Sequence, residues 1–176
     1  MKNRTDSCLD DRPRLAPLML AGTGSDVGKS VIATGLCRIF REDGYDPAPF
    51  KAQNMALNSY VTPDGLEIGR AQAVQAEAAG IACRSDMNPI LLKPCGDMTS
   101  QVVINGRPAG NRKAGDYFCK EGREELRRQV HEAYDRLASC YNPIVLEGAG
   151  SIAEINLSAI DLVNMSMARH AGADVI

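Results

Sequence analysis

Short apolar runs that end at glycine or proline alternate along the chain with longer segments whose apolar residues recur every three or four positions. The first run, residues 15–21 (LAPLMLA), is typical of a buried strand that leads into a loop, although Pro17 weakens its first half. From Lys29 onward the apolar residues follow a helical period that stops at Asp43-Gly44. The pattern therefore predicts a strand, a glycine-rich loop and a helix in that order.

The same alternation continues to the last residue. It predicts further strands at residues 47–51, 89–94, 101–105 and 142–146, helices at 67–79 and 117–137, and the opening of another strand at 173–176. Strands that alternate with helices favour an α/β fold, a mostly parallel sheet with helices on both faces. We expect one domain over residues 15–176, preceded by a loose polar leader over residues 1–14.

Composition narrows the classes of partner. The 176 residues include 20 basic and 22 acidic side chains, so the net charge of −2 gives no general attraction for nucleic acid or an anionic membrane. The six cysteines form no CxxC pair and are interpreted as reduced thiols, and no apolar run is long enough for a signal peptide or a membrane helix. We expect a cytoplasmic protein with no nucleic-acid or membrane partner, and a homo-oligomer remains open.

The loop after the first strand reads GTGSDVGKS and is the main candidate for chemistry. Glycines allow successive backbone N–H groups to point into one concavity, where a lysine and the start of a helix also attract phosphate. Five residues separate Gly22 from Gly28, where the common phosphate-binding loop has four, so this loop is a variant. We predict that it binds ATP with magnesium through Gly22, Thr23, Gly24, Ser25, Asp26, Val27, Gly28, Lys29 and Ser30.

A second candidate motif, Glu147-Gly-Ala-Gly150, follows the apolar strand at 142–146. Open α/β sheets bind ligands at the carboxyl ends of their strands, and a carboxylate there can hold magnesium opposite the Ser30 hydroxyl. Glu67, at the start of the alanine-rich segment, is either a third magnesium ligand or a favourable charge in the first turn of a helix. His131 and His170 lie in predicted helices without evident partners, and neither is assigned a role.

Five sequence blocks carry a resemblance to a known family. PFKAQNMALNS (49–59), EIGRAQAVQAEAAG (67–80), MNPILLKP (87–94), SQVVINGR (100–107) and LEGAGSIAEINL (146–157) resemble the N-terminal synthetase domain of the cobyric acid synthases. The loop itself resembles that of the wider dethiobiotin-synthetase-like group of P-loop NTPases. Gly24 stands where the dimeric switch ATPases carry an additional lysine, and Ile152 stands where the family commonly has proline.

The resemblance implies an ATP-dependent amidoligase of cobalamin biosynthesis. Such enzymes activate the b, d, e and g side-chain carboxylates of adenosylcobyrinic acid a,c-diamide as acyl phosphates, which ammonia from glutamine then attacks. It implies catalytic roles for Lys29, Lys51 and Glu147, magnesium ligation by Ser30, Glu147 and Glu67, and a polar substrate-binding stretch of Gln53, Asn54, Asn58 and Ser59. Full-length members of the family also carry a glutaminase domain. We expect this chain to be truncated and to lack that domain. The expected partner is therefore a glutaminase domain or subunit that supplies ammonia.

Several alternatives stay open at this point. From pattern alone Lys51 is equally a surface lysine, the polar stretch at 53–59 is equally a capped loop, and Asp26 is either near the metal or a turn residue. Two other functions also remain: a carboxylase of the dethiobiotin synthetase type, and a nucleotide-binding module that only docks a partner. The KAQNMALNS block argues against both.

Overall fold

Four short parallel strands form the centre of the molecule. The computed structural model describes residues 13–96, 99–113, 120–152 and 162–176. In it, the strand order is β10-β1-β9-β2, and each neighbouring pair is parallel. The strands are β1 (Leu18–Leu20), β2 (Ala48–Phe50), β9 (Ile144–Glu147) and β10 (Asp174–Val175). The apolar side chains of β1, β2 and β9 make these strands the buried middle layer, as the sequence pattern predicted, whereas both residues of β10 are exposed.

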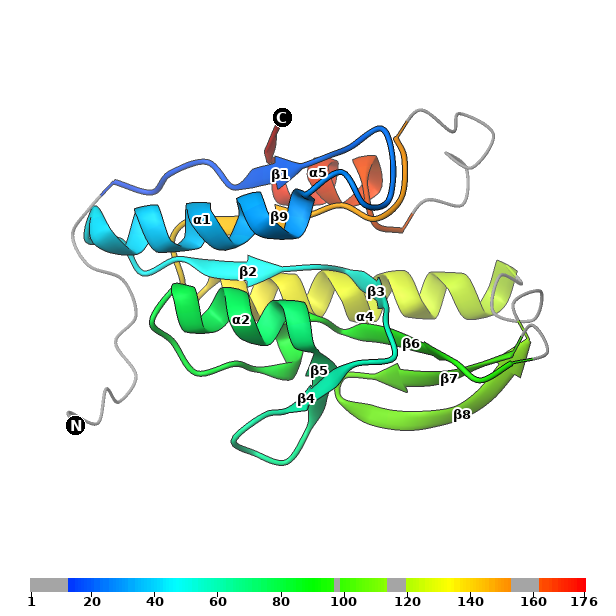
Figure 1. Cartoon of the computed structure of the whole chain (residues 1–176). Helices are drawn as coiled ribbons and strands as arrows, with labels where there is room; N and C mark the ends of the chain where they lie inside the picture. Colours follow the sequence, from blue (N-terminus) through cyan, green and yellow to red (C-terminus); the bar gives the residue numbers. More distant parts are fainter. Residues whose placement is uncertain (1–12, 97–98, 114–119, 153–161) are drawn as a thin grey trace.

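Helices cover both faces of this sheet, which confirms the predicted fold class (Figure 1). Successive side chains of β9 point to opposite faces: Val145 joins a cluster with α1, while Ile144 and Leu146 join the larger core against α4 and α5. The helices are α1 (Lys29–Glu42), α2 (Arg70–Ala78), α4 (Lys120–Ala138) and α5 (Met165–Ala171). Within the described ranges, no helix has the length and apolar character needed to cross a membrane.

A second sheet and a hairpin extend the molecule beyond β2. The second sheet has the order β3-β6-β7-β8, in which β3 and β6 are parallel and the other pairs antiparallel. A short 3₁₀ turn, η1 (Ser85–Met87), precedes β6. The strands are β3 (Gln53–Met55), β6 (Ile90–Pro94), β7 (Thr99–Ile104) and β8 (Arg107–Lys113), and the hairpin consists of β4 (Ser59–Val61) and β5 (Glu67–Gly69).

The sequence pattern predicted β6 and β7 but missed both hairpin turns. Asn105 and Gly106 join β7 to β8 with positive φ angles of 48° and 78°, the backbone conformation for which Asn-Gly is preferred in two-residue hairpins. A Pro-Asp-Gly turn at 63–65 joins β4 to β5, and Gly65 has a φ of 79°. Both turn signals were present in the sequence.

One predicted helix begins three residues later than expected. Residues 67–69 form β5 instead of the first turn of the 67–79 helix, because they pair with β4 and the Gly69 amide donates to Asn88 Oδ1 at 3.0 Å. The 117–137 helix is confirmed from Lys120, and residues 117–119 lie outside the described residues.

The two histidines have partners, contrary to the expectation from sequence. The rings of His131 on α4 and His170 on α5 stack with centroids 3.7 Å apart and planes 12° apart. His170 Nε2 also lies 2.9 Å from Asp135 Oδ1. This pair therefore joins the two helices on one face of the parallel sheet.

Candidate active site

The glycine-rich loop and the Glu147-Gly-Ala-Gly segment meet at the carboxyl ends of β1 and β9. Leu20 and Glu147 are paired in register, and the Gly148 amide donates to Leu20 O at 2.9 Å. One step further out, the Ile152 amide donates to Gly22 O at 3.0 Å. A proline at position 152 has no N–H and could not make this bond, so isoleucine here ties one loop to the other.

Lys29 lies inside the loop that it follows. Gly28 precedes the helix with a φ of 94°, a left-handed conformation that glycine adopts without strain, and α1 then begins at Lys29. The Lys29 ammonium donates to the carbonyl oxygens of Gly24 at 2.5 Å, Ser25 at 3.3 Å and Gly150 at 3.2 Å. The residue is only 7% exposed, so its charge is directed into the loop, where a phosphate would be the stronger partner.

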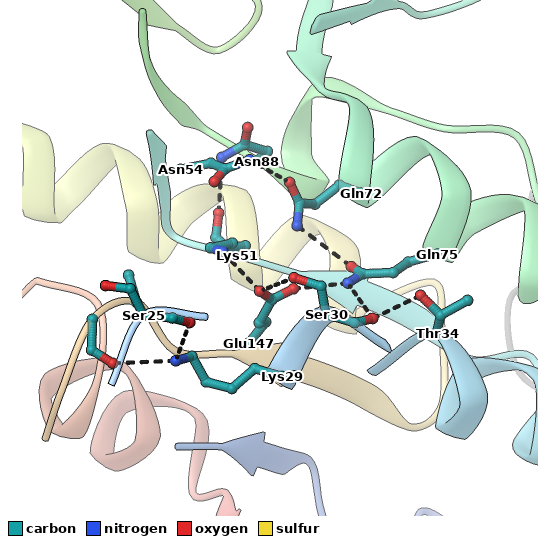
Figure 2. A network of polar contacts seen from close by, with 12 residues as sticks. Ser25, Lys29, Ser30, Thr34, Lys51, Asn54, Gln72, Gln75, Asn88 and Glu147 are labelled. Carbon is teal, nitrogen blue, oxygen red and sulfur yellow. Dashed lines mark hydrogen bonds and ion pairs between the residues drawn. The ribbon is translucent and has the colours of Figure 1, made fainter. Parts of the chain in front are cut away.

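Three polar side chains from separate elements converge on Glu147 (Figure 2). Its carboxylate is 2% exposed and accepts bonds from Ser30 Oγ at 2.6 Å, Lys51 Nζ at 2.7 Å and Gln75 Nε2 at 2.7 Å. These donors come from α1, from the residue after β2, and from α2. A buried carboxylate is stable only with such partners, so the site brings a hydroxyl, an ammonium and an amide onto one anion.

These residues fit a magnesium ion bound together with a nucleotide. The Ser30 hydroxyl and the Glu147 carboxylate are hard oxygen donors that already lie at hydrogen-bond distance, beside the lysine of the loop. Among the described residues there is no group of three His, Cys, Asp or Glu side chains that could hold a metal alone. Magnesium commonly takes few protein ligands and completes its shell with phosphate oxygens and water, which suits this pair.

Glu67, predicted as a third magnesium ligand, contacts a different cation. Its carboxylate lies 2.6 Å from Lys93 Nζ on β6. Burial raises the pKa of Glu67, but hydrogen bonds from Lys93 and Ser59 and the charge of Lys93 outweigh burial and lower the pKa below its ordinary value. Its role in the metal shell stays a prediction.

The predicted substrate residues lie in different surroundings. Asn54 is buried and donates to Gln72 Oε1 at 3.1 Å, whereas Asn58 is exposed and Gln53 and Ser59 are half-buried. Apolar residues of the same stretch face outward: Met55 is 64% exposed and Leu57 is 70% exposed. Asp26, Thr23 and Val27 are exposed in the glycine-rich loop.

Four further polar residues of the site were missed from sequence: Gln72, Gln75, Asn88 and Asn164. Asn164 binds Ala149 in both directions, accepting from its amide and donating to its carbonyl at 3.0 Å each. Asn88 Nδ2 donates to Lys51 O at 3.1 Å and to Ile90 O at 2.8 Å. The glutamines carried a usable signal, because two amides three positions apart on an alanine-rich helix need polar partners when that face is buried.

The fold and the site together define a P-loop nucleotide-binding domain. The family described as CobQ/CobB/MinD/ParA nucleotide binding domain matches residues 18–171, and the chain belongs to this family. No solved structure matches the chain.

Curated relatives narrow the comparison further. The cobyric acid synthase of Bacteroides fragilis is 75% identical over 162 residues, 92% of this chain and 33% of that protein. The cobyric acid synthase of Phocaeicola vulgatus is 74% identical over 165 residues, 94% of this chain and 33% of that protein. That of Parabacteroides distasonis is 61% identical over 163 residues, 92% of this chain and 33% of that protein. The chain thus spans about a third of the length of these relatives.

Proposed function

We propose that this chain is the ATP-using part of a cobyric acid synthase. In this proposal it activates the b, d, e and g side-chain carboxylates of adenosylcobyrinic acid a,c-diamide. The observation that supports it most is the convergence of Ser30 Oγ and Lys51 Nζ on Glu147 Oε1, at 2.6 Å and 2.7 Å, next to the lysine of the phosphate loop. Similarity to the cobyric acid synthases supports the choice of substrate.

The proposed reaction has two steps. An oxygen of the substrate carboxylate attacks the γ-phosphorus of ATP, the bond to the β–γ bridging oxygen breaks, and ADP leaves as the acyl phosphate forms. Ammonia then attacks the acyl carbon, inorganic phosphate leaves, and the nitrogen loses a proton to give the amide. The ammonia would come from glutamine through a glutaminase domain or subunit.

The residues of this chain would mainly position groups and neutralise charge, because phosphoryl transfer demands little else of a protein. Lys29 and the amides of residues 22–30 would bind the outer phosphates. Lys51, 12% exposed at its side chain, would hold the γ-phosphoryl group and the attacking carboxylate together. Magnesium, held by Ser30 and Glu147, would supply neutralisation of the charge on the phosphates.

The test is ADP formation by the full chain with ATP, magnesium and ammonium chloride. We expect ADP, and an added amide detected by mass, only when adenosylcobyrinic acid a,c-diamide is present. Lys51→Met should lower this rate by about 100-fold or more, as expected for loss of a charged group at the reacting atoms. Lys93→Met, which removes the partner of Glu67 in the neighbouring sheet, is the matched control and should keep the rate within about threefold.

Other outcomes separate the alternatives. ADP formation driven by diaminopelargonate and not by the corrinoid would replace the proposal with a carboxylase of the dethiobiotin synthetase type. Nucleotide binding with no turnover on either substrate, in the presence of ammonium, would favour a binding module.

A further inference from the structure

A line of buried side-chain amides leads from Glu147 to strand β3 (Figure 2). Gln75 Nε2 donates to Glu147 Oε2 at 2.7 Å, Gln72 Nε2 lies 3.5 Å from Gln75 Oε1, and Asn54 Nδ2 donates to Gln72 Oε1 at 3.1 Å. Both glutamines are 0% exposed and Asn54 is 8% exposed. Their hydrogen bonds therefore depend on one another and not on water.

The chemistry of Glu147 fixes the direction of this line. An ionised carboxylate only accepts hydrogen bonds, so Gln75 must turn its NH₂ group toward Glu147 and its carbonyl oxygen toward Gln72. Gln72 can then donate to Gln75 and accept from Asn54. Every amide in the line thus donates toward Glu147.

The two ends of the line lie on functionally different parts of the site. At one end, Gln75 Nε2 is also 3.5 Å from Ser30 O, in the first turn of α1. At the other end, Asn54 belongs to β3, which follows Lys51 after one residue. Asn88 holds this end in place, since it donates to Lys51 O at 3.1 Å and accepts from the Gly69 amide at 3.0 Å.

Close packing leaves the amides little freedom. A Cβ atom at Gly69 would contact Asn54 Nδ2 and would lie 2.8 Å from Gln72 Oε1. Glycine at this position therefore lets β5 approach the amides closely. Because the site is buried and tightly packed, a change in one amide must be taken up by its neighbours.

We propose that Gln75 is a positioning residue for Glu147, and that Gln72 and Asn54 keep Gln75 in its donating orientation. This inference rests on the proposed function, in which Glu147 holds magnesium with the nucleotide. It adds that a single line of amides orients the Glu147 carboxylate and also joins it to strand β3, which carries two of the predicted substrate residues, Gln53 and Asn54. Gln75 and Gln72 act only through Glu147 and are not catalytic residues.

The experiment measures the affinity of the full chain for ADP, once with excess magnesium and once with EDTA. Gln75→Met keeps the length of the side chain and removes the donor, and Gln72→Met removes the group that orients it. Gln129→Met is the matched control, because Gln129 Nε2 likewise donates to a glutamate, Glu125 Oε1 at 2.6 Å, but on the exposed side of α4. Thermal melting of each variant reports whether it folds.

We expect Gln75→Met to weaken ADP binding in magnesium by about 10-fold or more, the usual consequence of losing a residue that orients a metal ligand. Binding in EDTA should change less than about threefold, because phosphate contacts in the loop remain. Gln72→Met should act in the same direction with a smaller loss, and Gln129→Met should leave both affinities unchanged. Should Gln75→Met fail to fold, Gln75→Asn supplies the test, since it stays neutral and polar but its shorter side chain withdraws the donor from Glu147, and the loss should again be confined to magnesium.

Three results would overturn the inference. The first is a Gln75→Met chain that binds ADP in magnesium as tightly as the wild type, and the second is one whose binding weakens equally in magnesium and EDTA, as a merely structural role predicts. A wild-type chain that binds ADP equally under both conditions would instead overturn the proposed magnesium site, and the inference with it.

Discussion

The parallel sheet and the sheet formed by β3, β6, β7 and β8 carry their polar groups in opposite ways. In the parallel sheet β1, β2 and β9 are mostly apolar, and the polar groups lie at their carboxyl ends, where Glu147 ends β9 and Lys29 and Ser30 begin α1. In the second sheet a polar side chain, Asn54, is buried within strand β3 while its neighbour Met55 is 64% exposed. The same region holds an ion pair of its own, Glu67 with Lys93.

This difference separates polar groups that lie at the candidate site from polar groups that reach it only through other side chains. In the proposed function, the residues at the strand ends of the parallel sheet would contact the nucleotide directly, and strand pairing supports their backbone. The polar residues of the second region reach the site through other side chains, from Asn54 through Gln72 and Gln75 to Glu147. Changes in the first region should therefore alter ligand binding, whereas changes in the second should first alter stability.

The largest expected effect comes from comparing the buried carboxylate of Glu147 with the half-buried carboxylate of Glu67. Glu147→Gln should weaken magnesium-dependent ADP binding by about 100-fold, because it removes both the charge and a metal ligand. Glu67→Gln should weaken it less than about threefold, since its partner is Lys93. Calorimetric titration with and without magnesium measures both, and equal losses in the two variants would mean that Glu67 also holds the metal.

The next effect concerns folding at the junction of the two regions. Gly69→Ala should lower the free energy of unfolding by about 1–3 kcal/mol, because the added Cβ contacts the amides of Asn54 and Gln72. Gly35→Ala is the matched control: no atom lies within 4 Å of the added Cβ on exposed α1, so we expect a gain of about 0.5–1 kcal/mol. Urea unfolding curves of the two variants give both values, and a neutral Gly69→Ala would contradict the close packing described above.

A smaller effect should appear in the second region at acid pH. The folded-state pKa of Glu67 lies below its ordinary value of 4.5, so its stabilising contribution is present above about pH 4.5 and is lost as the pH falls through the folded-state value. Glu67→Gln should therefore flatten the acid side of the stability curve. Hydrogen exchange of β5 and β6 at pH 6 and at pH 3.5 measures this, and parallel curves for the two proteins would argue against it.

The smallest effect should come from helix α4, which packs on the parallel sheet, and should occur nearer neutral pH. Burial first, then the neighbouring His170, lowers the pKa of His131 below 6.5; Arg127 acts in the same direction and Asp135 opposes them. The unfolded chain therefore takes up this proton first, and stability should fall as the pH drops below about 6.5 toward the folded-state pKa. His131→Asn should reduce this slope in urea unfolding between pH 7.5 and 5.5, and an unchanged slope would exclude His131 as its source.

The spacing of apolar residues was sufficient to predict those helices and strands in which a single helical or strand pattern runs without interruption. The strands β1, β2, β6 and β9 were predicted within a few residues, because each buries consecutive apolar residues. The helix α1 was predicted as well, although it buries Ala33 and Cys37 and leaves Ile32 and Ile39 each 52% exposed. The strand Glu67–Gly69 was mistaken for helix, since its neighbours are strong helix formers and only pairing with β4 overrides that preference. The turns at 63–65 and at Asn105-Gly106 carried recognisable signals that were not used.

For the candidate site, the order strand, glycine loop and Lys29-Ser30 was readable because these residues are adjacent in the chain. The partners of Lys51 were not readable, since the pattern there fits a surface lysine equally well. In the structure its ammonium lies 2.7 Å from Glu147, a residue 96 positions away. The hydrogen bonds of the Gln72 and Gln75 amides could not be predicted from the sequence either, because each amide has a partner on another element.

The sequence by itself thus determined the loop, the helix that follows it and the apolar strands, for which short-range steric preferences and burial are enough. Only the tertiary structure decided which groups surround Glu147 and which cation Glu67 contacts. The physical reason is that hydrogen bonds and ion pairs between buried groups act over a few ångströms. Distant segments can satisfy that requirement only after the sheet has brought them together.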